Sequence, residues 1–234
     1  MVEDEIATVV IDRPERRGAL NLDLLGELAD AVDAVAGARA LILTGTEGNF
    51  CAGADLSELE DVSFTRDLGA LLRRLAGLPG VTIAAIDGVC FGLGMQLALA
   101  CDIRVVAPGA SFAVPVAKLG LMVDHWTLDR LARFWGEGTA RHLVLTGAIL
   151  DADDAWRLGF AQVRGDRAAA LELARSAAAL APLTQSGSKL GFGVHDPEGI
   201  GRYEAAFATA WASEDLQEGR AAFLERRPAL FRGE

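Results

Sequence analysis

The stretch that decides the fold is Ile86–Asp102, which reads IDGVCFGLGMQLALACD. A short apolar run with β-branched residues, 81–86, leads into it and predicts a buried strand. The residues 95–101 are apolar and form helices well, so they predict a buried helix. Glycines lie between the two, at positions 88, 92 and 94. A glycine turn that opens a helix leaves backbone N–H groups free to bind an anion or a developing oxyanion.

Two other interpretations of this stretch are weaker. Residues 81–101 are apolar enough to suggest a membrane span, but Asp87, Gln96 and the glycines argue against one. The start of a dinucleotide-binding G-x-G-x-x-G pattern is present at 92–94, but Leu97 replaces its third glycine. We therefore favour an oxyanion pocket, which requires a second backbone donor from elsewhere in the chain.

A second glycine turn can supply that donor. It lies in Asn49–Leu56, NFCAGADL, directly after a predicted strand at 40–45. Together the two stretches resemble the crotonase family, also called the enoyl-CoA hydratase/isomerase superfamily. Further matching motifs follow the same order along the chain: RPERRGAL at 13–20, CDIR at 101–104, LTG at 145–147 and FLERR at 223–227. The resemblance covers essentially the whole chain, and the ordered set is much more specific than any single motif.

Composition excludes several classes of protein. The 234 residues are 51% hydrophobic and 24% charged, which suits one sizeable globular core. The net charge of −11 disfavours nucleic acid and anionic membrane surfaces as partners. The acidic start, residues 1–5, does not resemble a signal peptide, and the three cysteines suit a reduced, cytoplasmic protein. We expect no metal site, because no Cys/His group has the spacing of metal ligands.

The remaining chain predicts an α/β fold that ends in helices. Expected strands are 6–11, 39–44, 102–106 and 111–113. Asn21 can cap a helix that runs to about residue 36, and a loop followed by a helix is expected over 56–77. A further helix is expected at 126–135, and almost everything from Gly136 onward reads as helical.

The family resemblance implies a specific architecture for these elements. It implies a spiral of ββα turns followed by a helical C-terminal region that packs on the core and on neighbouring subunits, usually in trimers or pairs of trimers. We expect 1–181 to form the acyl-CoA-binding core and 182–234 the oligomerisation region. Coenzyme A would enter as part of the substrate, and no separate cofactor is expected.

The resemblance also implies a set of site residues. Two backbone N–H groups hold the thioester oxygen in the family, and by motif they correspond to Ala54 and Leu93. Basic residues cluster at 13–17 and at 226–227, which suits either a solvated surface or a bound polyanion. In the family, the corresponding residues approach coenzyme A, those near the C-terminus often from a neighbouring subunit. The implied substrate contacts are Arg16, Ala19, Ala52, Asp55, Leu56, Gln96, Val116, Phe223 and Arg226.

The two catalytic glutamates of the family are absent from this sequence. They correspond to Gln96 and Val116. A glutamine amide cannot take a proton from water at neutral pH, and valine has no polar group. The two-glutamate hydration mechanism is therefore not expected. The pattern resembles an actinobacterial subgroup of crotonases that keeps the acyl-CoA-binding fold without the catalytic pair.

One acidic residue near the site has two interpretations. Asp124 corresponds to a working aspartate in dienoyl-CoA isomerases and in the benzoyl-CoA dehalogenases of the superfamily, where it acts as base or nucleophile. It also directly precedes a predicted helix, so its role can instead be that of an N-cap alone. We expect His125 to be a packed or surface residue, and Trp126, Phe134 and Trp135 to pack or to line an acyl tunnel. The sequence thus leaves open an acyl-CoA-binding protein and an enzyme that uses Asp124.

Overall fold

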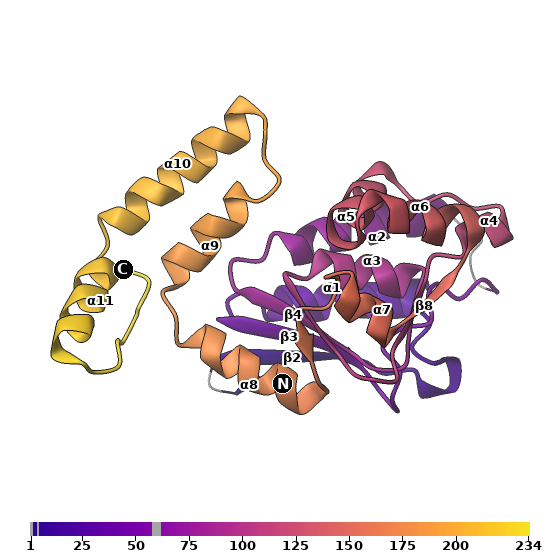
Figure 1. The fold of residues 1–234 in the computed structure, drawn as a ribbon, viewed down its shortest axis with the longest axis horizontal. Coiled ribbons are helices and arrows are strands. Elements are labelled where there is room, and N and C mark those ends of the chain that lie inside the picture. Colours follow the sequence, from indigo (N-terminus) through magenta and orange to yellow (C-terminus); the bar gives the residue numbers. More distant parts are fainter. Residues whose placement is uncertain (1, 4, 58–61) are drawn as a thin grey trace.

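Parallel strands form the centre of the molecule, seen here in a computed structural model (Figure 1). The structure describes residues 2, 3, 5–57 and 62–234. Parts of the acidic start and of the loop expected after Leu56, namely residues 1, 4 and 58–61, lie outside the described residues. The first sheet contains β1 (Val2–Glu3), β2 (Ile6–Ile11), β3 (Ala40–Gly45), β4 (Val81–Ile86), β6 (Ile103–Val106) and β9 (Val163–Arg164), in that order.

The order of these strands distinguishes the fold from a dinucleotide-binding sheet. All neighbouring pairs from β2 to β9 are parallel, and β1 pairs antiparallel with β2. The order rises steadily across the sheet without the reversal at which doubly wound sheets bind dinucleotides. A second sheet pairs β5 (Val89–Phe91), β7 (Ser111–Ala113) and β8 (Ile149–Asp151). The mixed α/β class predicted from the sequence is confirmed.

Helices cover both faces of the first sheet, and the side-chain alternation of its strands explains why. Along β3, Leu41 and Leu43 join the main core, whereas Ala40 and Ile42 join a smaller core against α8 (Arg167–Ala178). The main core includes α1 (Leu22–Ala34), α2 (Val62–Ala76) and α3 (Leu93–Ala100). Figure 1 shows α2 and α3 above the strands and α8 below them.

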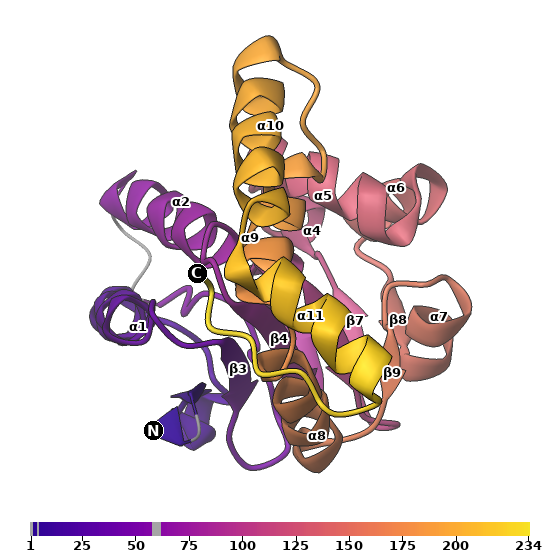
Figure 2. The same cartoon turned by 90° about the vertical axis from the view of Figure 1, so that its left-hand side faces the viewer.

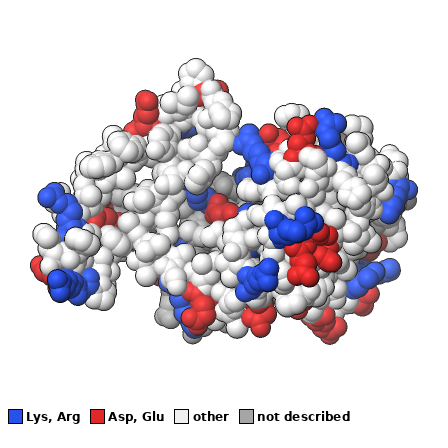
Figure 3. All heavy atoms as spheres, viewed as in Figure 1, with Lys and Arg blue, Asp and Glu red and all other residues white. Residues whose placement is uncertain are grey.

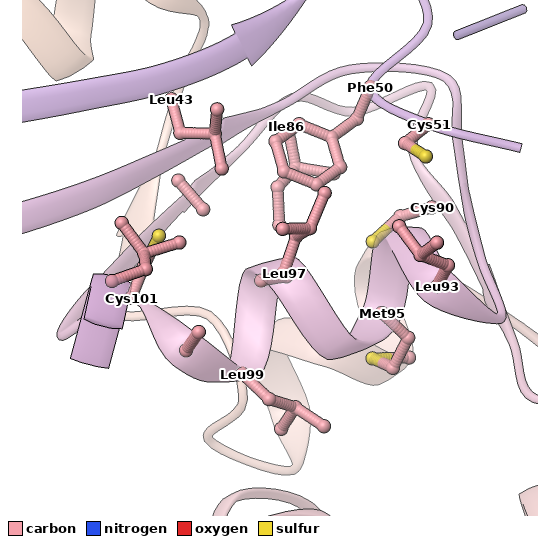
Figure 4. Close-up of a cluster of buried hydrophobic side chains, with 14 of the residues drawn as sticks. Leu43, Phe50, Cys51, Ile86, Cys90, Leu93, Met95, Leu97, Leu99 and Cys101 are labelled. Carbon is pink, nitrogen blue, oxygen red and sulfur yellow. The ribbon is translucent and has the colours of Figure 1, made fainter. Parts of the chain in front are cut away.

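Helix α3 is buried on all sides, as its composition predicted. Its residues pack against side chains of β3 and β4, with Leu97 facing Phe50 and Ile86 (Figure 4). A Cβ atom added to Gly94 would lie only 2.3 Å from the carbonyl oxygen of Cys51. The glycine therefore allows the first turn of α3 to approach the Asn49–Leu56 turn. The helix has eight residues and lies in the core, so it is much shorter than a membrane span, in agreement with the argument from Asp87, Gln96 and the glycines.

The second half of the chain is mostly helical but contains short strands that the sequence did not predict. The strands β8 and β9 each have three residues or fewer, too few to show a periodic pattern. The remaining helices of the described residues are α4 (Val116–Leu119), α5 (His125–Trp135), α6 (Glu137–Thr146), α7 (Ala152–Arg157), α9 (Pro182–Gly191), α10 (Pro197–Trp211) and α11 (Glu214–Glu225). A 3-10 turn, η1 (Pro14–Arg16), lies near the N-terminus.

The last three helices extend away from the core. In Figures 1 and 2, α9, α10 and α11 project from the side of the sheet beyond α8. They expose large apolar side chains, and the face of α9 and α10 seen in Figure 3 carries few charges. These exposed residues include Phe192, Phe207, Trp211, Phe223 and Leu224. An apolar surface of this kind marks an interaction site.

Candidate functional site

Two glycine turns lie side by side at the entrance to α3. The segments that lead into them pair like parallel strands around Cys51 and Cys90. The N–H of Cys51 donates to the carbonyl oxygen of Val89 at 3.0 Å, and the N–H of Phe91 donates to that of Cys51 at 2.9 Å. Each segment reaches its turn two residues after the paired cysteine, at Gly53 and at Gly92. The pairing therefore places the two turns next to each other.

The backbone N–H groups of Ala54 and Leu93 are both available for a ligand. The residues on either side of Ala54 are hydrogen-bonded to Leu20. The N–H of Leu20 donates to the carbonyl oxygen of Gly53, and the N–H of Asp55 donates to the carbonyl oxygen of Leu20. The N–H of Ala54 therefore points away from Leu20. Leu93 is the first residue of α3, so its N–H has no acceptor within the helix. In residues 5–57 and 62–234, neither N–H donates to another backbone group.

Glycine is required beside the two donors but not at them. Gly92 has φ 51° and ψ −110°, and Gly53 has φ 118°, both in a region that side chains with a Cβ atom rarely adopt. A Cβ atom added to Gly53 would lie 3.9 Å from the nitrogen of Leu93, so the turns are in close contact. Leu93 itself has ordinary helical geometry. Its leucine side chain therefore leaves the backbone donor in place.

Both turns open into a cavity of about 890 Å³. Its wall contains seven of the residues predicted for the site: Ala52, Ala54, Leu56, Leu93, Gln96, Val116 and Asp124. Most of the remaining wall is apolar and comes from α2 and from the segment between α4 and α5. Such a cavity, with a few polar groups at one end, is suited to a mostly apolar ligand.

A second, more apolar cavity of about 600 Å³ adjoins the first. It lies among α4, α5 and α6, and Val116, Leu121, Met122, Val123 and His125 line both cavities. The segment 121–125 therefore forms a common wall. Met122 is 91% exposed, so little packing holds this wall in place on its outer side.

Gln96 occupies the inner wall and is already hydrogen-bonded. Its side chain is buried, and its amide nitrogen donates to the hydroxyl of Thr127 at 2.8 Å. Val116, the first residue of α4, is half-buried on the same cavity. Neither residue can act as a general base at neutral pH, because a glutamine amide and a valine side chain cannot take up a proton there.

Asp124 both caps a helix and lines the cavity. Its carboxylate accepts a hydrogen bond from the N–H of Thr127 at 2.7 Å, which confirms the predicted N-cap of α5. The same side chain is solvent-exposed at the cavity wall. A chemical role for Asp124 stays a prediction.

The aromatic residues after Asp124 have separate roles. Trp126 lines the cavity, as does His125. Trp135 is buried and stacks on Phe160 with ring centroids 4.3 Å apart. Phe134 packs under the guanidinium of Arg104, 4.3 Å from its ring centroid. Only Trp126 of the three predicted aromatic residues therefore faces the ligand space.

Asp55 supports the site from outside the cavity. Its carboxylate forms an ion pair with Arg13 at 3.0 Å and accepts from the hydroxyl of Ser57 at 2.6 Å. The hydrogen bond from Ser57 and the charge of Arg13 hold the pKa of Asp55 below its usual 3.8. These contacts tie the loop at 13–19 to the turn that contains Ala54. Asp55 itself does not line the cavity.

The remaining predicted contacts lie farther from the cavity. Arg16 is exposed on the loop that packs beside Ala52, and Ala19 lies on the same loop, close to the paired residues Leu20 and Ala54. Phe223, near the end of α11, is exposed, as is Arg226 just after it. These two do not line the cavity of their own chain.

Sequence reasoning did not identify the contribution of α2. Thr65, Gly69 and Arg73 line the cavity at intervals of four residues, which places them on one side of the helix. That spacing was visible in the sequence, but the buried leucines of α2 dominate its pattern. Thr127, which joins Gln96 to the helix start at Asp124, was also not identified.

Two expected absences concern the residues that the structure describes. Within residues 5–57 and 62–234, no three His, Cys, Asp or Glu side chains lie close enough to hold a metal ion. Among the described helices, none combines the length and apolar character needed to cross a membrane.

Comparisons with known proteins show the family of this chain. The model of the family described as enoyl-CoA hydratase/isomerase matches residues 2–234. The chain is 38% identical to the Mycobacterium leprae protein named "Probable enoyl-CoA hydratase echA6", with 97% of this chain and 96% of that protein covered. It is 34% identical to the mouse protein named "Methylglutaconyl-CoA hydratase, mitochondrial", with 98% of this chain and 80% of that protein covered.

Solved structures show the same fold. The crystal structure of an enoyl-CoA hydratase from Bacillus anthracis superposes with a TM-score of 0.90 at 28% identity, covering 98% of this chain and 96% of that chain. The family match extends over nearly every residue, and it includes both turns that carry the backbone donors. The chain therefore belongs to the enoyl-CoA hydratase/isomerase family, the crotonase superfamily.

Proposed function

We propose that this protein binds a fatty acyl-CoA thioester, with the thioester oxygen between the N–H groups of Ala54 and Leu93. The supporting observation is the contact between the two glycine turns, which brings these unpaired donors to one end of the cavity. Backbone donors fixed in this way stabilise a negative charge on oxygen without moving. The two adjoining cavities give an acyl chain apolar surroundings beyond that point.

The proposal includes a loss of ordinary hydratase chemistry. Gln96 and Val116 stand where the family has its glutamates, so the protein would hold the thioester without activating water. An acyl-CoA-binding fold without the two glutamates resembles the actinobacterial subgroup of crotonases. Reduced thiols at all three cysteines are consistent with a cytoplasmic location, which is part of the proposal.

A pair of variants at Leu93 tests the binding mode. Proline is tolerated at the first position of a helix, so Leu93→Pro removes the N–H donor at small cost to α3. Leu93→Ala loses a similar amount of packing but keeps the donor. Calorimetry with octanoyl-CoA should give a dissociation constant at least about tenfold weaker for Leu93→Pro than for Leu93→Ala. No binding of octanoyl-CoA to the parent at high micromolar ligand would refute the proposal.

A second candidate function is an enzyme that uses Asp124. The observation that favours it is the position of this carboxylate on the wall of the same cavity. A base there could remove a proton from the acyl chain while the two N–H groups stabilise the enolate. Turnover of any acyl-CoA that disappears in Asp124→Asn would support this function over simple binding.

The proposed assembly divides the chain at about residue 181. Residues 1–181 would bind acyl-CoA, and 182–234 would join subunits into a trimer or hexamer through the apolar side chains exposed on α9–α11. Phe223 and Arg226 would then contact the acyl-CoA bound by a neighbouring subunit. Neither residue lines the cavity of its own chain, which is consistent with this arrangement.

A further inference from the structure

Helix α2 brings two guanidinium groups, those of Arg66 and Arg73, to a cavity that is otherwise mostly apolar. Arg73 lines the cavity together with Gly69, one turn earlier on the same side of the helix. Its side chain folds back over this glycine. A Cβ atom added to Gly69 would lie 3.4 Å and 3.5 Å from the two terminal nitrogens of Arg73. Any side chain longer than a methyl group at position 69 would push the guanidinium off this surface.

The glycine is unfavourable for the helix itself. In the middle of a helix, glycine is destabilising relative to alanine. Gly69 is nevertheless buried, because the Arg73 side chain covers it. The Arg73 side chain, which is itself exposed, therefore lies along the cavity wall over Gly69.

Among the described residues, Arg73 has no ion-pair partner, whereas the nearby arginines of α2 have one. Arg74 forms an ion pair with Asp33 at 2.6 Å, and Arg66 forms one with Asp67 at 2.8 Å. Across the described ranges 5–57 and 62–234, no carboxylate lies within 4.0 Å of the Arg73 guanidinium. An arginine on a ligand cavity without a protein counter-ion is suited to an anionic group on the ligand.

The position of α2 indicates which part of the ligand carries that group. The loop at 13–19, expected to approach coenzyme A, does not line the cavity. The walls that extend from the donors come from α2 and from the segment between α4 and α5. Arg73 therefore belongs to the space for the acyl group. The phosphates of coenzyme A would lie outside this space, next to the loop at 13–19.

We propose that the preferred ligand is an acyl-CoA whose acyl group ends in a carboxylate, and that Arg73 binds this carboxylate. The proposal rests on the acyl-CoA-binding function proposed above and narrows its ligand class to dicarboxylic acyl thioesters. Arg73 is then a specificity-determining residue. The apolar wall accommodates the methylene groups between the thioester and the terminal carboxylate.

Matched ligands test this proposal by calorimetry. Glutaryl-CoA and adipoyl-CoA are compared with pentanoyl-CoA and hexanoyl-CoA, which have the same chain lengths without the terminal carboxylate. We expect at least one dicarboxylic ligand to bind about tenfold or more tightly than its partner, as for a charged hydrogen-bonded pair. Arg73→Gln should remove this preference. Arg74→Gln, which changes the adjacent arginine outside the cavity, should keep it.

Each contrary outcome has a distinct meaning. Equal binding of the two ligand series to the parent overturns the proposal but leaves acyl-CoA binding intact. An equal loss of both series in Arg73→Gln, with an unchanged melting temperature, assigns Arg73 to a coenzyme A phosphate and also overturns it. No binding of any thioester, including octanoyl-CoA, refutes the proposed function itself.

Discussion

The side-chain amide of Gln96 donates to the hydroxyl of Thr127 at 2.8 Å, and the N–H of the same threonine donates to Asp124. Thr127, which is buried, thus joins Gln96 to Asp124, two residues that were predicted for the site. Thr127 is fully buried, so the connection is protected from water. Substitutions at Gln96 and at Asp124 can therefore separate effects on catalysis from effects on stability.

Restoring both carboxylates should restore hydration. We expect the parent to hydrate crotonyl-CoA at background rate, because positions 96 and 116 carry no acid or base. The double variant Gln96→Glu, Val116→Glu should raise that rate by a factor on the order of 10² or more, and either single variant by much less. The decrease in enoyl thioester absorbance measures it. Hydration by the parent at ordinary enoyl-CoA hydratase rates would contradict the prediction.

The capping role of Asp124 can be measured independently of any activity. Asparagine is as good an N-cap as aspartate, so Asp124→Asn should leave the free energy of unfolding nearly unchanged. Asp124→Ala should lower it by about 1 kcal/mol, because the N–H of Thr127 loses its acceptor. Urea unfolding followed by circular dichroism compares the three proteins. Equal stability of the alanine variant and the parent would show that the cap is unimportant.

Asp55 should make stability depend on acid. Its pKa is lower in the folded protein than the usual 3.8, so its ionised form stabilises the fold above that value. This contribution disappears as the pH falls through the lowered pKa. Asp55→Asn should therefore be less stable than the parent near pH 7, and the gap should close below about pH 3.8. A gap that is constant between pH 7 and pH 3 would argue against the ion pair with Arg13.

The three cysteines should resist thiol reagents in the native protein. Burial raises the pKa of Cys51 and Cys101 to about 12 and that of Cys90 well above its usual value, so almost no thiolate forms near pH 8. Ellman's reagent should react slowly with the folded protein and fully with three thiols in guanidinium chloride. Fast reaction of the native protein would show that the core around α3 opens.

A charge on the exposed C-terminal surface should disrupt assembly. Trp211, on α10, is 63% exposed in the single chain, and burial of its ring between subunits would contribute strongly to association. Trp211→Glu should shift the mass measured by light scattering from the oligomer toward the monomer. It should also weaken octanoyl-CoA binding if a neighbour supplies Phe223 and Arg226. Arg202→Glu, an exposed change on the same helix, serves as the control. A monomeric parent would refute the assembly proposal.

The sequence predicted the elements that have strong periodic or cap signals. The strand 81–86, the cap at Asn21 and the helix ending at Trp135 agree with the structure within a residue or two. The turn motifs identified Ala54 and Leu93, because glycines at a turn allow backbone conformations that leave N–H groups free to bind an anion.

Other parts of the site depend on contacts between distant segments. The face of α2 that lines the cavity was not predicted. The leucines of α2 indicate which face is buried in the core, but the sequence does not indicate what lies against the residues beside that face. The bond between Gln96 and Thr127 joins residues 31 positions apart, and no local pattern reveals it. Whether Phe223 belongs to the site is a question of subunit arrangement, which a single sequence does not specify.

The parallel backbone bridge between Cys51 and Cys90 determines where the chain tolerates insertions and deletions. Ala54 and Leu93 each follow a paired cysteine by three residues, so the separation of the donors derives from the spacing of adjacent strands, about 4.8 Å. Side-chain replacements along either segment leave this spacing unchanged. Adding or removing one residue between a cysteine and its donor would rotate the N–H out of the cavity. A library of single-residue indels should therefore be depleted at 52–53 and 91–92 even where substitutions survive.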